Sequence, residues 1–96
     1  MIEIKFDKPY QFEDESHDSI VIDLESMTTR DLIKIESKYK REVKNASAVK
    51  ELDTQFIILV AVHASGKVVE FFDKLPIKEM AKIKGEVIPF LMNAGE

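Results

Sequence analysis

The chain has 96 residues, a length typical of one domain, and 45% of them are hydrophobic, as in ordinary globular proteins. It contains no cysteine, which excludes disulfide bonds and thiolate metal sites and is compatible with a reducing compartment. Its first residues lack the basic and apolar regions of a signal peptide, and its net charge of −4 argues against a dedicated nucleic-acid-binding protein.

The charge is unevenly distributed along the chain. Residues 1–27 carry eight acidic and two basic side chains, a net charge of −6, whereas residues 28–50 carry seven basic and three acidic ones, a net charge of +4. The acidic and basic segments can attract each other, either within the fold or between subunits.

The first 27 residues predict a β-hairpin. Apolar residues alternate with polar ones in two segments, at Ile2, Ile4 and Phe6 and again at Ile20, Ile22 and Leu24. This period of two is typical of half-buried strands. Residues 7–9 are expected to break the first strand because proline cannot donate to a ladder, residues 10–12 can add a short extended piece, and residues 13–18 predict a polar turn. A lone hairpin is marginally stable in water, so this one should lie on helices or pair with another chain.

A first helix is predicted from Thr29 to about Asn45. Thr28 and Asp31 place a hydroxyl and a carboxylate where they can cap the first turn. The apolar stripe of this helix consists of Leu32, Ile35, Tyr39 and Val43, and residues 45–47 are expected to break the helix.

The central helix is predicted from about Ala48 to Ser65. It contains the unbroken apolar run from Phe56 to Val62, which is far too short to span a membrane and is expected at the centre of the core. The β-branched residues of this run also suit a buried strand. The spacing of the apolar residues by three and four, together with the stop signal at Ser65–Gly66, favours a helix.

The last third predicts a short helix within residues 67–75 and a closing helix introduced by Pro76. One face of the closing helix is apolar and comprises Ile77, Met80, Ala81, Val87, Ile88 and Leu91. A kink or an early end is expected at Pro89, which removes the hydrogen bond to the Gly85 carbonyl.

The predicted fold class is therefore α+β in a single domain spanning residues 1–96. A short N-terminal antiparallel β-hairpin (residues 1–27) precedes a mainly helical segment (residues 28–96) with three main helices and a short connecting helix.

The sequence offers little catalytic chemistry. His17 lies in an acidic turn with Asp14, Glu15 and Asp18. A solvated turn is favoured there over a metal site, because the spacing matches no metal motif. His63 is expected to pack against the core with its nitrogens at the edge. The sequence has neither a nucleophile elbow nor a glycine-rich phosphate loop, so we predict a protein without enzymatic activity, cofactor or bound metal.

Two sets of residues are candidates for binding a partner. Four basic residues spaced by four, four and three form a stripe on the first helix: Arg30, Lys34, Lys38 and Arg41. This stripe suits a solvated face, an acidic protein surface or nucleic-acid phosphates. The apolar candidates are concentrated in the last third: Phe71, Phe72, Phe90, Leu91 and Met92. They suit a partner groove, although each residue taken singly also suits core packing.

Three segments carry a family resemblance. They are the helix start LESMTTRDLIKIE (residues 24–36) after an extended N-terminal segment, the central helix end HASGKVVEFFDKL (63–75) and the closing helix PIKEMAKIKGEVIPFL (76–91). Together they resemble the tail assembly chaperone family of long-tailed bacteriophages and prophages over most of the chain.

The resemblance implies a role in virion morphogenesis in the cytoplasm of a bacterial host. Chaperones of this family bind the long, largely helical tape measure protein and keep it soluble until tail tube subunits polymerise around it, and a longer frameshifted product often accompanies the short one. A homo-oligomer would present several binding surfaces along one client. Two other functions suit the residues: a small nucleic-acid-binding or regulatory module that uses the basic stripe, and a structural subunit of the tail.

Overall fold

The computed structural model describes residues 1–42 and 53–93. In these residues the elements follow in the order β1 (Ile2–Phe12), β2 (Glu15–Ile22), α1 (Thr29–Glu42), α2 (Thr54–Ser65), α3 (Val69–Asp73) and α4 (Ile77–Asn93). This order confirms the predicted α+β class, with a hairpin first, three longer helices and a short connecting helix. The predicted break at residues 45–47 lies outside the described residues.

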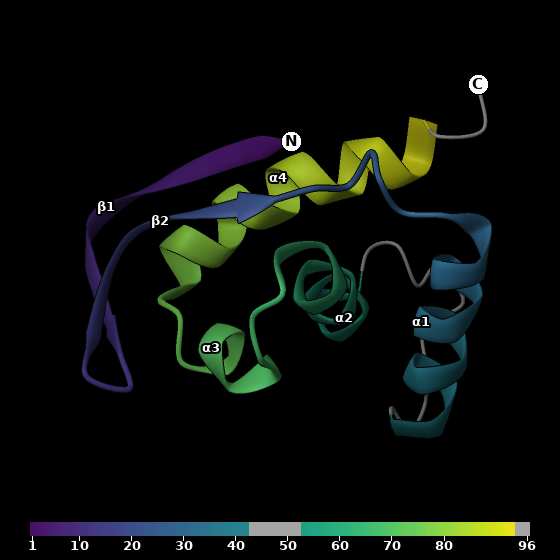
Figure 1. Ribbon diagram of the computed structural model, residues 1–96, viewed down its shortest axis with the longest axis horizontal. Coiled ribbons are helices and arrows are strands. Elements are labelled where there is room, and N and C mark those ends of the chain that lie inside the picture. The colour runs from purple at the N-terminus through teal and green to yellow at the C-terminus, as the bar shows by residue number, and fades with distance from the viewer. Residues whose placement is uncertain (43–52, 94–96) are drawn as a thin grey trace.

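Helix α2 lies at the centre of the molecule, with the hairpin and the other three helices around it (Figure 1). The run from Phe56 to Val62 is helical, as predicted. It is apolar on all sides, so it has to be covered from several directions, and the surrounding elements provide that cover. The buried residues of α2 are Phe56, Ile57, Leu59, Val60 and Ala61.

Local signals determine both ends of α2. At the C-terminal end Gly66 has a φ of 77°, and its N–H donates to the Val62 carbonyl at 3.0 Å, as the predicted glycine stop requires. The N-terminal end is later than predicted, because Asp53 is extended, with φ −83° and ψ 124°. The Asp53 carboxylate accepts a hydrogen bond from the Gln55 N–H at 2.8 Å and so caps a helix that begins at Thr54.

The turn of the hairpin is shorter than predicted. It consists of Glu13 and Asp14, whose φ angles are 49° and 64°. Positive φ at both central residues is the feature of a two-residue type I′ turn, which matches the twist of the strands on either side. Strand β2 therefore begins at Glu15, four residues before the predicted start.

Strand β1 is continuous where a break was predicted. The register joins Lys5 to Ser19 and then Tyr10 to His17, so four residues of β1 lie opposite one residue of β2. Such a bulge leaves residues without ladder partners, and Pro9 lies within it, where its missing N–H is tolerated.

The hairpin lies on the helices, which confirms one of the two predicted arrangements. Its inner face buries Ile4, Phe6, Ile20 and Ile22 in the common core. Directly after β2, the Asp23 N–H donates to the carbonyl at the end of α2 at 3.0 Å, which fastens the hairpin to the central helix.

Helix α1 begins with the predicted cap. The Thr28 N–H donates to the Asp31 carboxylate at 2.9 Å, and the Asp31 N–H donates to the Thr28 hydroxyl at 3.2 Å. The buried face of α1 contacts α2 through Tyr39, whose ring centroid lies 5.3 Å from that of Phe56. The Tyr39 hydroxyl donates to the Asp53 carboxylate at 2.7 Å, so α1 is also linked to the start of α2.

Helix α4 corrects one prediction and decides between the two alternatives of another. It continues beyond Pro89, so the early end expected there is wrong, and the kink stays a prediction. The buried apolar residues of α4 are Met80, Ile83 and Val87, with at most 7% of each residue exposed. Ile77 was predicted on the buried face but is 88% exposed. Ile83 comes six positions after Ile77, so the two side chains point about 120° apart around the helix and do not lie on one face.

Candidate partner-binding surfaces

The structure buries Phe71 and Phe72, which corrects their assignment to a free binding surface. The two residues are only 1% and 2% exposed. The Phe71 ring makes edge contacts with the rings of Tyr10 and His17, with centroids 5.0 and 5.1 Å apart. The Tyr10 hydroxyl also donates to the Phe71 carbonyl at 2.8 Å. Because α3 is short and lies beneath the hairpin, both rings serve to hold it in the core.

The end of α4 remains exposed. Phe90 is 36% exposed and Met92 is 55% exposed, while Leu91 is half-buried against the core. We call these three residues the α4 end patch. The three residues are consecutive in one helix and point in different directions, so Leu91 contacts the core while Phe90 and Met92 face solvent. The patch is the portion of the predicted apolar surface that the fold leaves accessible.

A further apolar surface was not predicted from the sequence. A groove of about 610 Å³ lies between α2, α3 and α4, and Ile58, Leu75 and Met80 contribute to its walls. Ile77 also lines this groove and is the most exposed large apolar residue among those described. The helical angle between Ile77 and Ile83 was the sequence signal that could have identified it.

The four predicted basic residues share one exposed face of α1, as their spacing requires. We call Arg30, Lys34, Lys38 and Arg41 the α1 basic face. Within the described part of the chain none of the four forms an ion pair. A shallow groove of about 150 Å³ runs between this face and α2, with Lys34, Lys38 and His63 among its lining residues. The face is therefore available to an acidic partner.

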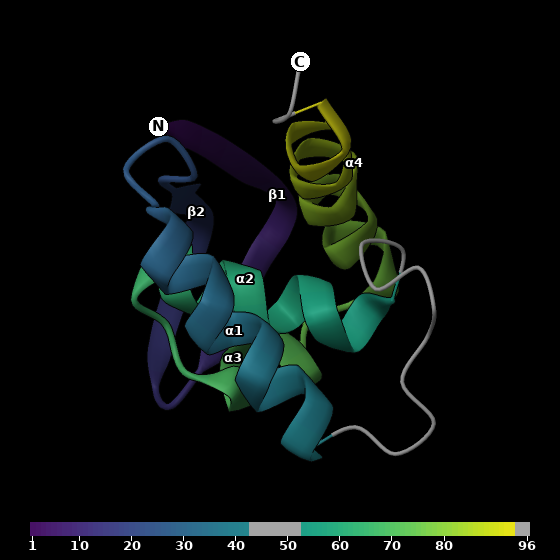
Figure 2. The same ribbon diagram turned by 90° about the vertical axis from the view of Figure 1, so that its right-hand side faces the viewer.

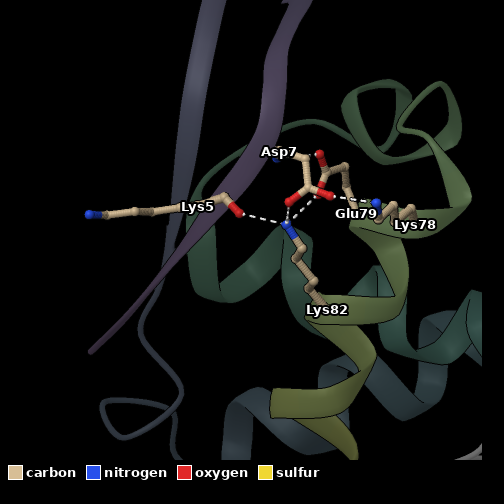
Figure 3. Close-up of polar contacts among 5 residues, drawn as sticks. All are labelled: Lys5, Asp7, Lys78, Glu79 and Lys82. Carbon is tan, nitrogen blue, oxygen red and sulfur yellow. Dashed lines mark hydrogen bonds and ion pairs between the residues drawn. The ribbon is translucent and has the colours of Figure 1, made fainter.

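A polar cluster fastens β1 to α4 (Figure 3). The Lys82 ammonium donates to the Lys5 carbonyl at 3.0 Å and to the Asp7 carboxylate at 2.6 Å, and Lys78 pairs with Asp7 at 2.9 Å. Glu79 is 5% exposed, accepts a hydrogen bond from the Asp7 N–H at 2.8 Å and lies 2.9 Å from the Lys82 ammonium. Glu79 thus accepts the hydrogen bond of the Asp7 N–H, which the bulge leaves without a partner in the ladder.

The charges of this cluster stabilise one another. Hydrogen bonds from Lys82 and Lys78 lower the pKa of Asp7 from 3.8 to about 2. The hydrogen bond from Lys82 also lowers the pKa of Glu79, and the two carboxylates raise the pKa of Lys82 in return. These contacts link Lys5 and Asp7 of β1 to Lys78, Glu79 and Lys82 of α4, and we call the five residues the charged clamp. The sequence did not indicate it, because the Asp7 N–H and Glu79 are 72 positions apart.

Both histidines lie in surroundings that differ from those predicted. His17 belongs to β2 and packs on the Phe71 ring, not in a solvated turn. The His63 Nε2 lies 3.4 Å from the Asp31 carboxylate, and the His63 side chain is 41% exposed, so it bridges α2 and α1 at the surface. Among the described residues no group of three or more histidine, aspartate or glutamate side chains is arranged to hold a metal ion.

Comparison of the chain with protein-family models, curated protein sequences and solved structures found no match. None of the described helices combines the length and the apolarity that crossing a membrane requires. The surfaces that the described part of the fold leaves open to a partner include the α4 end patch, the groove beside Ile77 and the α1 basic face.

Proposed function

We propose that this chain is a non-catalytic protein-binding domain and that it acts as a phage tail assembly chaperone. In this role it binds the tape measure protein in the cytoplasm of the bacterial host and keeps it soluble during tail morphogenesis. The observation that carries the proposal is the exposed α4 end patch, where Phe90 and Met92 face solvent at the end of a helix whose other side is in the core.

The chemistry of the patch suits an amphipathic client helix. Such helices are recognised when their apolar face lies against an apolar surface on the partner. Met92 has a flexible, polarizable side chain that adapts to different contacts, and Phe90 adds a large rigid area. The chain is also 33% charged, which keeps a protein with exposed apolar residues in solution.

Co-expression tests this proposal directly. The parent chain should keep its tape measure protein soluble and should co-purify with it. Replacing Phe90 and Met92 together by Asp should reduce the recovered client at least about tenfold, since a desolvated carboxylate opposes apolar contact. Ile33→Asp is the matched control, because Ile33 is 42% exposed on α1 and lies outside the patch, and this variant should retain the client.

Two outcomes contradict the proposal in different ways. Full client recovery by the doubly substituted protein would exclude the α4 end patch as the binding surface. A client that stays insoluble with the parent chain would exclude the chaperone function itself. Circular dichroism spectra like that of the parent are required of each variant, so that a loss of client is not a loss of fold.

The neighbouring genes supply an independent test. A very long open reading frame with helical periodicity directly downstream is the expected context of a chaperone for the tape measure protein. A longer product that shares residues of this chain and arises by frameshifting is expected from the same locus. Purified virions should lack the protein, whereas its recovery in finished particles would indicate a structural tail subunit.

The α1 basic face favours a second candidate, a small nucleic-acid-binding or regulatory module. Its four side chains are exposed and form no ion pair within the described residues, so they are free to contact phosphates. Replacing Arg30, Lys34 and Lys38 by Glu should abolish DNA retention at low salt if this function is correct. No retention by the parent chain would exclude it.

A further inference from the structure

The acidic turn of the hairpin and the basic helix α1 lie at opposite ends of the molecule (Figure 1). The turn between β1 and β2 and the helix α1 occupy the two ends of the longest axis, which measures 34 Å (Figure 1). Seen along that axis, α1 is nearest the viewer and the turn is on the far side (Figure 2). Among the described residues, the carboxylates at the turn of the hairpin therefore form no ion pair with the basic residues of α1 in the same chain.

The acidic end carries four exposed carboxylates. Glu13 and Asp14 form the turn, and Glu15 and Asp18 follow on β2. Val68 lies beside them and is 51% exposed, and it shares a shallow depression of about 200 Å³ with Glu13 and Glu15. Lys67 also lines this depression, with its ammonium 5.7 Å from the centroid of the Phe71 ring. We call the four carboxylates the acidic tip.

The basic end has complementary chemistry. The α1 basic face borders the groove between α1 and α2, whose floor includes the apolar side chains of Leu59 and Val62. The acidic residues of the same helix are Asp31, Glu36 and Glu42. Asp31 is engaged by His63 and by the helix cap, so it does not neutralise the basic face directly. The acidic tip complements this end, because its carboxylates can pair with the basic side chains while Val68 contacts Leu59 and Val62.

We propose that the acidic tip of one copy docks on the α1 basic face of a second copy. Both surfaces belong to every chain and lie at opposite ends, so the contact is head-to-tail and leaves one free surface at each end of a pair. Copies then add in sequence, to a closed ring or an open chain. This inference stands independently of the client and of the α4 end patch, neither of which takes part in the contact.

The electrostatic character of the contact predicts its strength and its salt dependence. Exposed ion pairs are individually weak, and salt screens them over a Debye length of about 10 Å at 0.1 M. The association should therefore be weak, and it should be strongest at low ionic strength.

Sedimentation velocity at about 20 mM and about 500 mM salt tests the proposal. The parent chain should sediment as a concentration-dependent assembly at the lower salt and as a monomer at the higher. One variant carries Lys34→Glu and Lys38→Glu, and the other carries Glu15→Lys and Asp18→Lys. Each variant alone should associate at least about tenfold more weakly than the parent, because like charges then face each other across the contact.

Mixing the two variants provides the decisive measurement. The unchanged acidic tip of the first variant then meets the unchanged basic face of the second, and the two reversed surfaces also match, so association should return. A control with Lys8→Glu and Lys74→Glu changes the net charge as much as the first variant does but leaves both surfaces intact, so it should assemble like the parent.

The opposite results would overturn the proposal. A parent chain that is monomeric at low salt excludes the contact, as does a mixture of the two variants that remains monomeric while each variant is folded by circular dichroism. Retention of DNA by a monomeric parent would assign the α1 basic face to phosphates instead. Loss of self-association in a chain that still keeps the tape measure protein soluble would separate this inference from the proposed function.

Discussion

Replacing Phe71 by Ala tests whether the aromatic cluster beneath the hairpin stabilises the fold. Phe71 is 1% exposed, and its ring has edge contacts with Tyr10, Phe12, His17 and Phe72 at centroid distances between 5.0 and 5.4 Å. Truncating a buried Phe to Ala costs about 3–5 kcal/mol, and lost aromatic pairs place this site toward the upper end of that range. The hydrogen bond from the Tyr10 hydroxyl goes to the backbone of residue 71, so the substitution leaves it in place.

Urea denaturation measures the effect. A domain of this size has a free energy of unfolding of about 5–14 kcal/mol, and m is about 1–2 kcal/mol per molar urea, so the midpoint should fall by at least about 1.5 M. Val68→Ala is the control, because Val68 lies three positions before Phe71 but is 51% exposed. This variant should lose less than about 0.5 kcal/mol of unfolding free energy. A loss below about 1 kcal/mol at Phe71 with an unchanged m would refute the assignment of this ring to the core.

Two further predictions concern the backbone and the charged clamp. Gly66→Ala should destabilise the protein by about 1–2 kcal/mol, because its φ of 77° is unfavourable for a residue with a Cβ, even though that Cβ would meet no atom within 4 Å. Gly85→Ala in α4 should instead stabilise the protein by about 0.5–1 kcal/mol, because Gly85 lies inside a helix and an added Cβ there also meets no atom within 4 Å. Equal changes in the urea midpoint for the two variants would contradict this reasoning. The pKa of Asp7 is lowered from 3.8 to about 2, so its ion pairs stabilise the fold above pH 4 and this contribution is lost as the pH falls toward 2. Asp7→Asn should therefore be less stable than the parent at pH 7 and converge with it near pH 2, and parallel pH profiles would exclude the clamp.

Features with a local cause could be predicted from the sequence. The reciprocal cap between Thr28 and Asp31 and the left-handed Gly66 involve residues a few positions apart, and both occur in the structure as expected. The helix that contains Phe56 to Val62 also followed from local spacing. These signals determined the order of the elements and therefore the fold class.

Features that depend on distant partners could not be predicted in the same way. Pro9 led to the prediction of a break in β1, but the structure has a bulge there. A bulge is recognised only when the register of the opposite strand is known. The sequence around Phe71 and Phe72 is compatible with rings that face solvent and with rings that pack in the core. The tertiary structure shows that both are buried. For the binding surface, a set of apolar residues could therefore be predicted from the sequence, and the fold leaves Phe90 and Met92 of that set exposed.

Burial of Glu79 beneath β1 has a consequence for biosynthesis. The strand emerges from the ribosome first, and the carboxylate that receives the Asp7 N–H is added 72 positions later. At synthesis rates of about 5–20 residues per second this delay lasts roughly 4 to 15 seconds, during which the nascent hairpin lacks the helix that will cover its edge. Until Glu79 has been added, the Asp7 N–H lacks the carboxylate that accepts its hydrogen bond in the folded protein.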